Sequence, residues 1–205
     1  MLTLSTDAHA LGCARTQWHL GMSSWRFTPL RRGFESYTGY LGGGEDYWIH
    51  GTDTELDFWE GQEPLFNYTC WEKNACPHEF YSANVFAEKA IAVIEQAAAQ
   101  PKPKPLFLYL AWQSVHSGGR LQLQAPQDYI DGFSKTVPLA GPLGTKRREL
   151  AGMVRSMDEG VGNVTKALSA AGMFEDTLII FSTDNVRRRK WLIQISQHTP
   201  KPILT

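Results

Sequence analysis

Apolar residues recur at helical spacing in two long stretches of the chain. The first stretch runs from Phe80 to Ala99 and ends before Pro101, and the second runs from about Lys146 to Ala171. Gly172 stands where a glycine would cap the second helix. Both stretches predict amphipathic helices, because their apolar residues share one face. The stripe residues are Val85, Phe86, Ala90, Val93, Ile94 and Ala97 in the first stretch and Leu150, Met153, Val154, Met157, Val161, Val164 and Leu168 in the second.

Two short continuous apolar runs predict strands that are buried on both faces. They cover Leu106 to Ala111 and Thr177 to Thr183. The chain therefore alternates helix, strand, helix and strand, an order that predicts an α/β fold with a largely parallel sheet and covering helices. Residues 20–79 are rich in Gly, Trp, Tyr and acidic residues without clear periodicity. That segment predicts long loops with short strands.

Length and charge narrow the classes of partner. The chain has 205 residues, enough for one domain, and its 20 basic and 21 acidic residues give a formal net charge of −1. This balance offers no electrostatic footprint for nucleic acid or an anionic membrane. No apolar run approaches the roughly 18–20 residues of a transmembrane helix. Residues 1–12 lack the charged and apolar regions of a secretory signal.

Cysteines and glycosylation motifs bear on the cellular compartment. Cys70 and Cys76 lie close together in an irregular polar stretch, so they form either a small disulfide loop or, with Cys13, a set of free thiols. The sequons at Asn67 and Asn163 favour a glycoprotein of the secretory pathway. Asn163 falls well off the apolar stripe of the second helix, which predicts that it faces solvent.

Polar residues follow both predicted strands at the point where each strand ends. His116 comes after the first strand, and Asp184 and Asn185 come after the second. Ligands of open α/β sheets bind at the carboxyl ends of the strands. Carboxylate and amide oxygens suit Ca²⁺, and an imidazole can bind an anionic ester or protonate its leaving oxygen. The alternatives are a strand-terminating turn for Asp184 and Asn185 and an ordinary loop residue for His116.

Several sequence blocks occur together in the order found in the sulfatase family. The resemblance covers about residues 16–185. It is closest to the arylsulfatase B-like branch, which is the branch of N-acetylgalactosamine-4-sulfatase-like enzymes. The blocks are Trp18 to Met22, Pro29 to Tyr37, Gly39 to Leu41, Pro105 to Ala111, Gln113 to His116, Ala151 to Met153, Met157 to Glu159, Gly162 to Thr165 and Phe181 to Asn185.

The resemblance implies a lysosomal or secreted enzyme with an alkaline-phosphatase-like α/β fold, here a partial one. Such enzymes hydrolyse sulfate esters of glycosaminoglycans or aryl sulfates, with a formylglycine nucleophile and a bound calcium ion. His19 and His116 match catalytic histidines, and His116 also contacts sulfate. Asp184 and Asn185 match calcium ligands. Lys190 matches a catalytic, sulfate-binding lysine if an internal stretch has been deleted before it.

The chain also departs from the family pattern. Gln17 replaces a lysine, and the formylglycine motif is not found, since none of the three cysteines is followed two residues later by proline. Phe27 to Arg31 imitates the shape of that motif, with phenylalanine in place of the cysteine, but aligns with a different block of the family. We therefore expect a partial catalytic domain over 1–191, truncated at the N-terminus and inactive alone, followed by an unmatched, loose tail over 192–205. The alternatives are a non-catalytic binder of sulfated glycans that uses His19, His116 and residues 187–190, and an unstable truncated product. A phosphatase or phosphodiesterase of the same superfamily is a more distant alternative.

Overall fold

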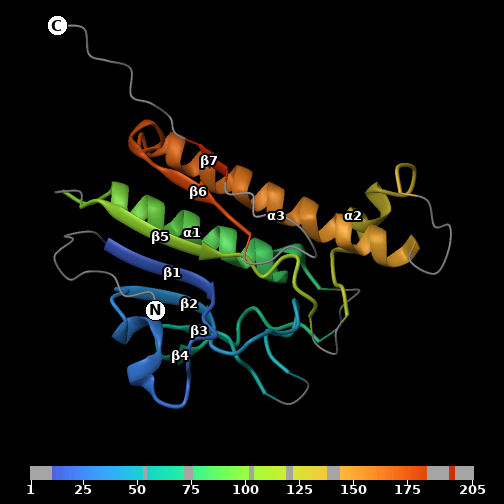
Figure 1. The fold of residues 1–205 in the computed structure, drawn as a ribbon, viewed down its shortest axis with the longest axis horizontal. Coiled ribbons are helices and arrows are strands. Elements are labelled where there is room, and N and C mark those ends of the chain that lie inside the picture. The colour runs from blue at the N-terminus through green and yellow to red at the C-terminus, as the bar shows by residue number, and fades with distance from the viewer. Residues whose placement is uncertain are drawn as a thin grey trace, which may run out of the picture.

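A five-stranded sheet forms the centre of the protein in a computed structural model (Figure 1). The structure describes residues 11–52, 55–71, 76–101, 104–118, 122–137, 144–183 and 194–196. The strand order is β4-β3-β2-β1-β5, with β1 parallel to both β2 and β5 and with β3 antiparallel to both β2 and β4. The strands are β1 (Leu11–Gln17), β2 (Ser36–Tyr40), β3 (Trp59–Glu60), β4 (Glu63–Pro64) and β5 (Leu106–Ala111).

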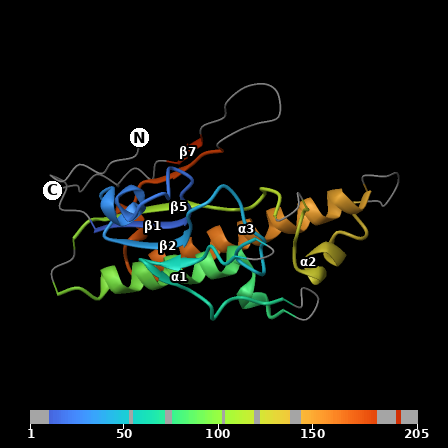
Figure 2. The same ribbon diagram turned by 90° about the horizontal axis from the view of Figure 1, so that it is seen from below.

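Helices pack against one face of this sheet (Figure 2). The long helices α1 (Ser82–Ala98) and α3 (Gly144–Ala170) lie side by side, and the short α2 (Gln127–Gly132) packs against α3. A separate two-stranded antiparallel sheet joins β6 (Ile179–Phe181) to β7 (Gln194–Ser196). Short 3-10 helices complete the fold: η1 (Trp25–Phe27), η2 (Pro29–Arg31), η3 (His78–Phe80) and η5 (Phe174–Asp176). None of the described helices is long and apolar enough to cross a bilayer.

The first predicted helix is confirmed in bounds and orientation. All of its six stripe residues are buried in α1. The α3 helix is confirmed in extent, and Gly172 caps it with a φ of +69° while the Met173 amide donates to the Leu168 carbonyl at 2.9 Å.

The predicted apolar stripe of α3 is confirmed at Met153, Val164 and Leu168 but wrong at Leu150 and Val154. Leu150 and Val154 are 39% and 44% exposed, whereas Gly152, Ser156 and Gly160 are buried. Small residues at this spacing let the helix approach its neighbours closely. A Cβ built on Gly160 would lie 2.5 Å from the Trp112 ring, so only glycine fits there without movement.

The structure corrects the expected burial of the strand at Leu106–Ala111. Leu106, Leu108 and Leu110 pack against the cluster formed by α1 and α3, but Phe107 and Tyr109 on the other face are 37% and 38% exposed. The strand predicted at Thr177 to Thr183 is shorter, and it pairs antiparallel with β7 in a separate sheet. Its expected burial on both faces is wrong, because Ile180 and Phe181 are 63% and 44% exposed. Strand β7 itself falls in the segment that was expected to be a loose tail.

Candidate active site

The three parallel strands bring their carboxyl ends to one edge of the sheet. The pairing of β1 with β2 continues past the strands, because the Trp18 amide donates to the Tyr40 carbonyl at 2.9 Å and the His19 amide to the Leu41 carbonyl at 3.2 Å. His19 then turns the chain with a φ of 44°. Left-handed backbone at a non-glycine residue is uncommon and is often found at functional sites.

A run of glycines after β2 lies beside both His19 and His116. A Cβ built on Gly43 would lie 2.6 Å from Cε1 of His19, and one built on Gly44 would lie 3.5 Å from Cε1 of His116. The two imidazoles therefore lie against consecutive glycines, and both side chains are exposed. One comes from the end of β1 and the other from the loop after β5.

Side chains on both sides hold this glycine segment in place. The Asp57 carboxylate accepts hydrogen bonds from the Leu41 amide at 3.0 Å and the Gly42 amide at 2.7 Å. On the opposite side, the Gln17 side-chain amide donates to the Gly43 carbonyl at 2.8 Å. Gln17 thus holds the backbone of Gly43, the residue that lies against the His19 ring. Sequence reasoning missed Asp57, which has no motif of its own.

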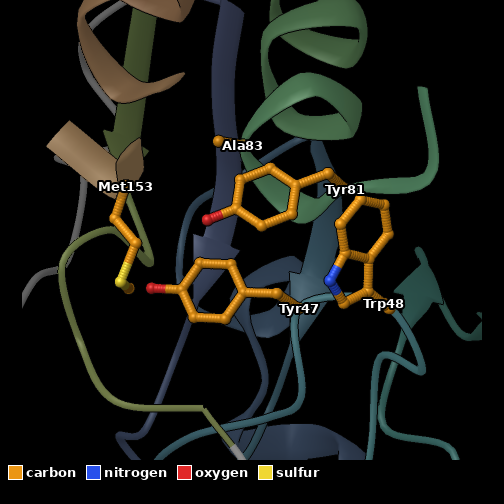
Figure 3. Close-up of a cluster of buried hydrophobic side chains, with 5 residues drawn as sticks. All are labelled: Tyr47, Trp48, Tyr81, Ala83 and Met153. Carbon is orange, nitrogen blue, oxygen red and sulfur yellow. The ribbon is translucent and has the colours of Figure 1, made fainter. Parts of the chain in front are cut away.

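A buried tyrosine fixes the loop that carries His116. The Tyr47 hydroxyl lies 2.9 Å from the Gln113 carbonyl oxygen and 2.8 Å from that of His116, and its single proton can be donated to either. Its ring stacks on Tyr81 with centroids 5.1 Å apart (Figure 3). Burial raises the pKa of Tyr47 above its usual 10, so the hydroxyl remains a donor.

The orientation of His116 follows from its own hydrogen bond. Nδ1 of His116 lies 2.8 Å from the Ser117 carbonyl oxygen. A carbonyl oxygen only accepts, so Nδ1 carries a proton and Nε2 is left to meet a ligand. The imidazole can therefore accept a proton at Nε2 or, once charged, donate one there.

Beneath the glycine segment lies a buried carboxyl and imidazole pair. Oε1 of Glu45 is 3.6 Å from Nδ1 of His50, and neither side chain is exposed. Nε2 of His50 lies 2.8 Å from the Phe80 carbonyl oxygen and must donate to it, so Nδ1 of the neutral ring is an acceptor. Burial raises the pKa of Glu45 well above its usual range and lowers the pKa of His50 to about 4. Both shifts favour a neutral pair whose proton resides on Glu45.

Three of the predicted site residues cannot be placed relative to the histidines from the described residues. Asp184, Asn185 and Lys190 lie outside the described residues. Within the described part of the chain, no three His, Cys, Asp or Glu side chains are grouped so that they could hold a metal ion. The predicted glycosylation residues Asn67 and Asn163 are both exposed.

All three cysteines are accounted for in the structure. Cys70 and Cys76 form a disulfide with a Cα–Cα distance of 5.8 Å. Cys13 is a free thiol, buried within β1 with 1% of its surface exposed. None of them is therefore an accessible thiol.

Comparisons with known proteins agree on one family. A sulfatase family model matches residues 8–200. Arylsulfatase J of Mus musculus is 32% identical over 175 residues, which cover 82% of this chain and 26% of the relative. The arylsulfatase of Klebsiella aerogenes is 25% identical over 213 residues, covering 82% of this chain and 43% of the relative. The chain thus spans less than half the length of these relatives.

Solved structures show the same fold. The crystal structure of Ps i-CgsB in complex with k-i-k-neocarrahexaose superposes with a TM-score of 0.69 at 24% identity, covering 86% of this chain and 38% of that one. The PsFucS1 sulfatase from Pseudoalteromonas sp. gives a TM-score of 0.59 at 19% identity, covering 86% and 36%. The chain therefore belongs to the sulfatase family and carries part of its alkaline-phosphatase-like α/β fold.

Proposed function

We propose that this chain supplies the histidine-bearing part of the active site of a sulfate ester hydrolase. The observation that carries the proposal is the placement of His19 and His116 against the consecutive residues Gly43 and Gly44, beyond the carboxyl ends of the parallel strands. Family membership and the two arylsulfatase relatives support the same reaction. Because the chain spans 26% and 43% of those relatives, a complete site would include parts of a longer protein, and an arylsulfatase B-like substrate range belongs to that whole protein.

The two imidazoles define what this part of the site does. When protonated, they offer N–H donors to the oxygens of a sulfate ester, and charge-assisted hydrogen bonds of this kind are about twice as strong as neutral ones. As the S–O bond to the alcohol breaks, the leaving oxygen takes a proton from Nε2 of His116, the nitrogen that Ser117 leaves free. The Ser117 carbonyl and Tyr47 keep that nitrogen directed outward.

Calcium enters the proposal only through residues outside the described structure. Asp184 and Asn185 offer the hard oxygen ligands that Ca²⁺ prefers, and the ion would neutralise charge on the sulfate. Two residues are too few for its usual six to eight oxygens. The described residues do not form a calcium site, so none of the steps above depends on the ion.

We propose that the chain alone does not hydrolyse sulfate esters. A nucleophile is required, and the three cysteines are either disulfide-bonded or buried. The test is hydrolysis of an aryl sulfate by the purified chain with calcium, compared with a His116→Ala variant. We expect both rates to equal the uncatalysed rate. Turnover above that of the variant would refute the proposal.

A second function, binding of sulfated glycans without hydrolysis, is favoured by the same combination of exposed histidines and unavailable thiols. It predicts that the chain binds a sulfated glycosaminoglycan in a salt-sensitive manner and releases no sulfate. Binding that persists unchanged in His19→Ala and His116→Ala variants would contradict this function.

A lysosomal or secreted location is part of the proposal. The disulfide and the exposed Asn67 and Asn163 support it, since disulfides persist in oxidising compartments. Expression with a secretion signal in mammalian cells should give a protein whose gel mobility increases on glycosidase treatment. Variants Asn67→Gln and Asn163→Gln should each lose one step of that shift, and a chain without any shift would contradict the glycoprotein assignment.

A further inference from the structure

The segment that follows His19 exposes large apolar side chains beside a cluster of arginines. Leu20, Met22 and Trp25 are 52%, 56% and 39% exposed. Residues 19–32 contain three arginines and no acidic residue. Exposed apolar surface rimmed by charge often marks a binding site. We infer that this segment is a second anion subsite, which binds a neighbouring acidic or sulfated sugar of an oligosaccharide whose sulfate ester lies at His19 and His116.

Two of the arginines converge on one aromatic ring. The guanidinium carbons of Arg26 and Arg32 lie 4.5 Å and 5.7 Å from the centroid of the Phe27 ring. In the part of the chain that the structure describes, neither guanidinium is paired with a carboxylate. An anion bound at either guanidinium would supply the missing counter-charge. Each guanidinium also keeps N–H donors suited to sulfate or carboxylate oxygens.

Hydrogen bonds fold this segment back toward the histidine. The Trp18 indole N–H lies 3.1 Å from the Gly21 carbonyl oxygen and 2.9 Å from that of Phe27. A Cβ built on Gly21 would lie 3.4 Å from Cβ of Phe27, so the side chain of Phe27, over whose ring the two arginines lie, begins next to Gly21. Two residues of backbone span at most about 7 Å. The arginine pair is therefore within the reach of an oligosaccharide bound at His19.

Trp25 supplies an apolar surface for a sugar ring. It packs edge-on against Trp59, with ring centroids 5.3 Å apart and planes at 80°. The indole N–H of Trp59 donates to Asp57 at 2.8 Å, and Asp57 also holds the Gly42 amide. A rigid indole joined in this way to the glycine segment is a suitable platform for the apolar face of a pyranose, since it loses little conformational entropy on binding.

The inference rests on the proposed function, and its test separates the two. The probes are inorganic sulfate and a chondroitin sulfate hexasaccharide, each titrated calorimetrically into the full chain. We expect the Arg26→Gln/Arg32→Gln variant to lose at least about tenfold in hexasaccharide affinity and to keep the inorganic sulfate binding that His116→Ala removes. Trp25→Ala should weaken only the hexasaccharide. Arg147→Gln, which removes an exposed charge from α3, is the matched control and should change neither affinity.

Unchanged hexasaccharide affinity in the double variant, or no hexasaccharide binding by the native chain, would overturn the second subsite. If inorganic sulfate still binds and His116→Ala abolishes that binding, the proposed function survives this failure. Conversely, arginine-dependent hexasaccharide binding without any binding of inorganic sulfate would support the subsite and contradict the proposed role of His19 and His116.

Discussion

Replacing Glu45 by glutamine tests whether the buried pair with His50 holds a proton on the carboxyl group. The substitution conserves volume and keeps a neutral side chain beside Nδ1 of His50 at every pH. The two side chains are fully buried and 3.6 Å apart. An ionised carboxylate here would lack any other hydrogen-bond donor, since neither oxygen of Glu45 has a partner among the described residues.

The effect on stability depends on pH in a defined direction. The raised pKa of Glu45 contributes stability at low pH that is lost as the pH rises above about 4.3, the unfolded value. The lowered pKa of His50 contributes stability that is present above about pH 6.5 and lost as the pH falls toward about 4. The two contributions cancel between these values. Above about pH 6.5 only the loss at Glu45 remains, at about 1.4 kcal/mol for each pH unit until its folded-state pKa is reached.

The assay is urea unfolding followed by tryptophan fluorescence at several pH values between 5 and 8. In the difference between the free energies of unfolding of the native chain and Glu45→Gln, His50 contributes equally to both and cancels. We expect this difference to fall as the pH rises above about 5, by at most about 1.4 kcal/mol per pH unit. Imidazole ¹⁵N shifts of His50 in the native chain should report a neutral ring. A difference that does not change with pH would refute the reasoning.

Two further predictions concern stability. Gly160→Ala should destabilise the chain by about 1–3 kcal/mol, because its Cβ would meet the Trp112 ring. Gly162→Ala in the same helix, with nothing within 4 Å of its Cβ, should stabilise it by up to about 1 kcal/mol, and equal effects in thermal unfolding would contradict this packing. Replacing Cys70 and Cys76 together by serine should cost roughly 2 kcal/mol, as expected for a loop this short. An unchanged melting temperature would show that the loop is constrained without the disulfide.

The sequence predicted those parts of the fold in which local pattern and packing agree. Helix α1 has its apolar residues on one stripe, which it buries against α3 and the sheet, so periodicity alone identified its core. The blocks around His19 and His116 also identified the family. Those predictions depend on short-range pattern, which the sequence displays directly.

Features that depend on tertiary contacts were not predicted. The buried face of α3 follows Gly152, Ser156 and Gly160, which carry no hydrophobic signal and matter because Trp112 and Ala125 approach them. The apolar run of strand β5 predicts burial on both faces, but Phe107 and Tyr109 on one face are 37% and 38% exposed. Asp57 accepts hydrogen bonds from the amides of Leu41 and Gly42, which lie 16 and 15 positions before it in the sequence. Only the folded backbone brings such groups together.

Titration of inorganic sulfate into the chain, followed by the NMR signals of its histidine rings, tests the central claim most directly. The account predicts that His19 and His116 shift together with one dissociation constant, while the more distant His78 does not. Gly43→Ala, whose Cβ would lie 2.6 Å from the His19 ring, should weaken binding by about tenfold or more, whereas Gly44→Ala, at 3.5 Å from His116, should have little effect. Equal shifts at all three rings, or none, would contradict a sulfate site formed by His19 and His116.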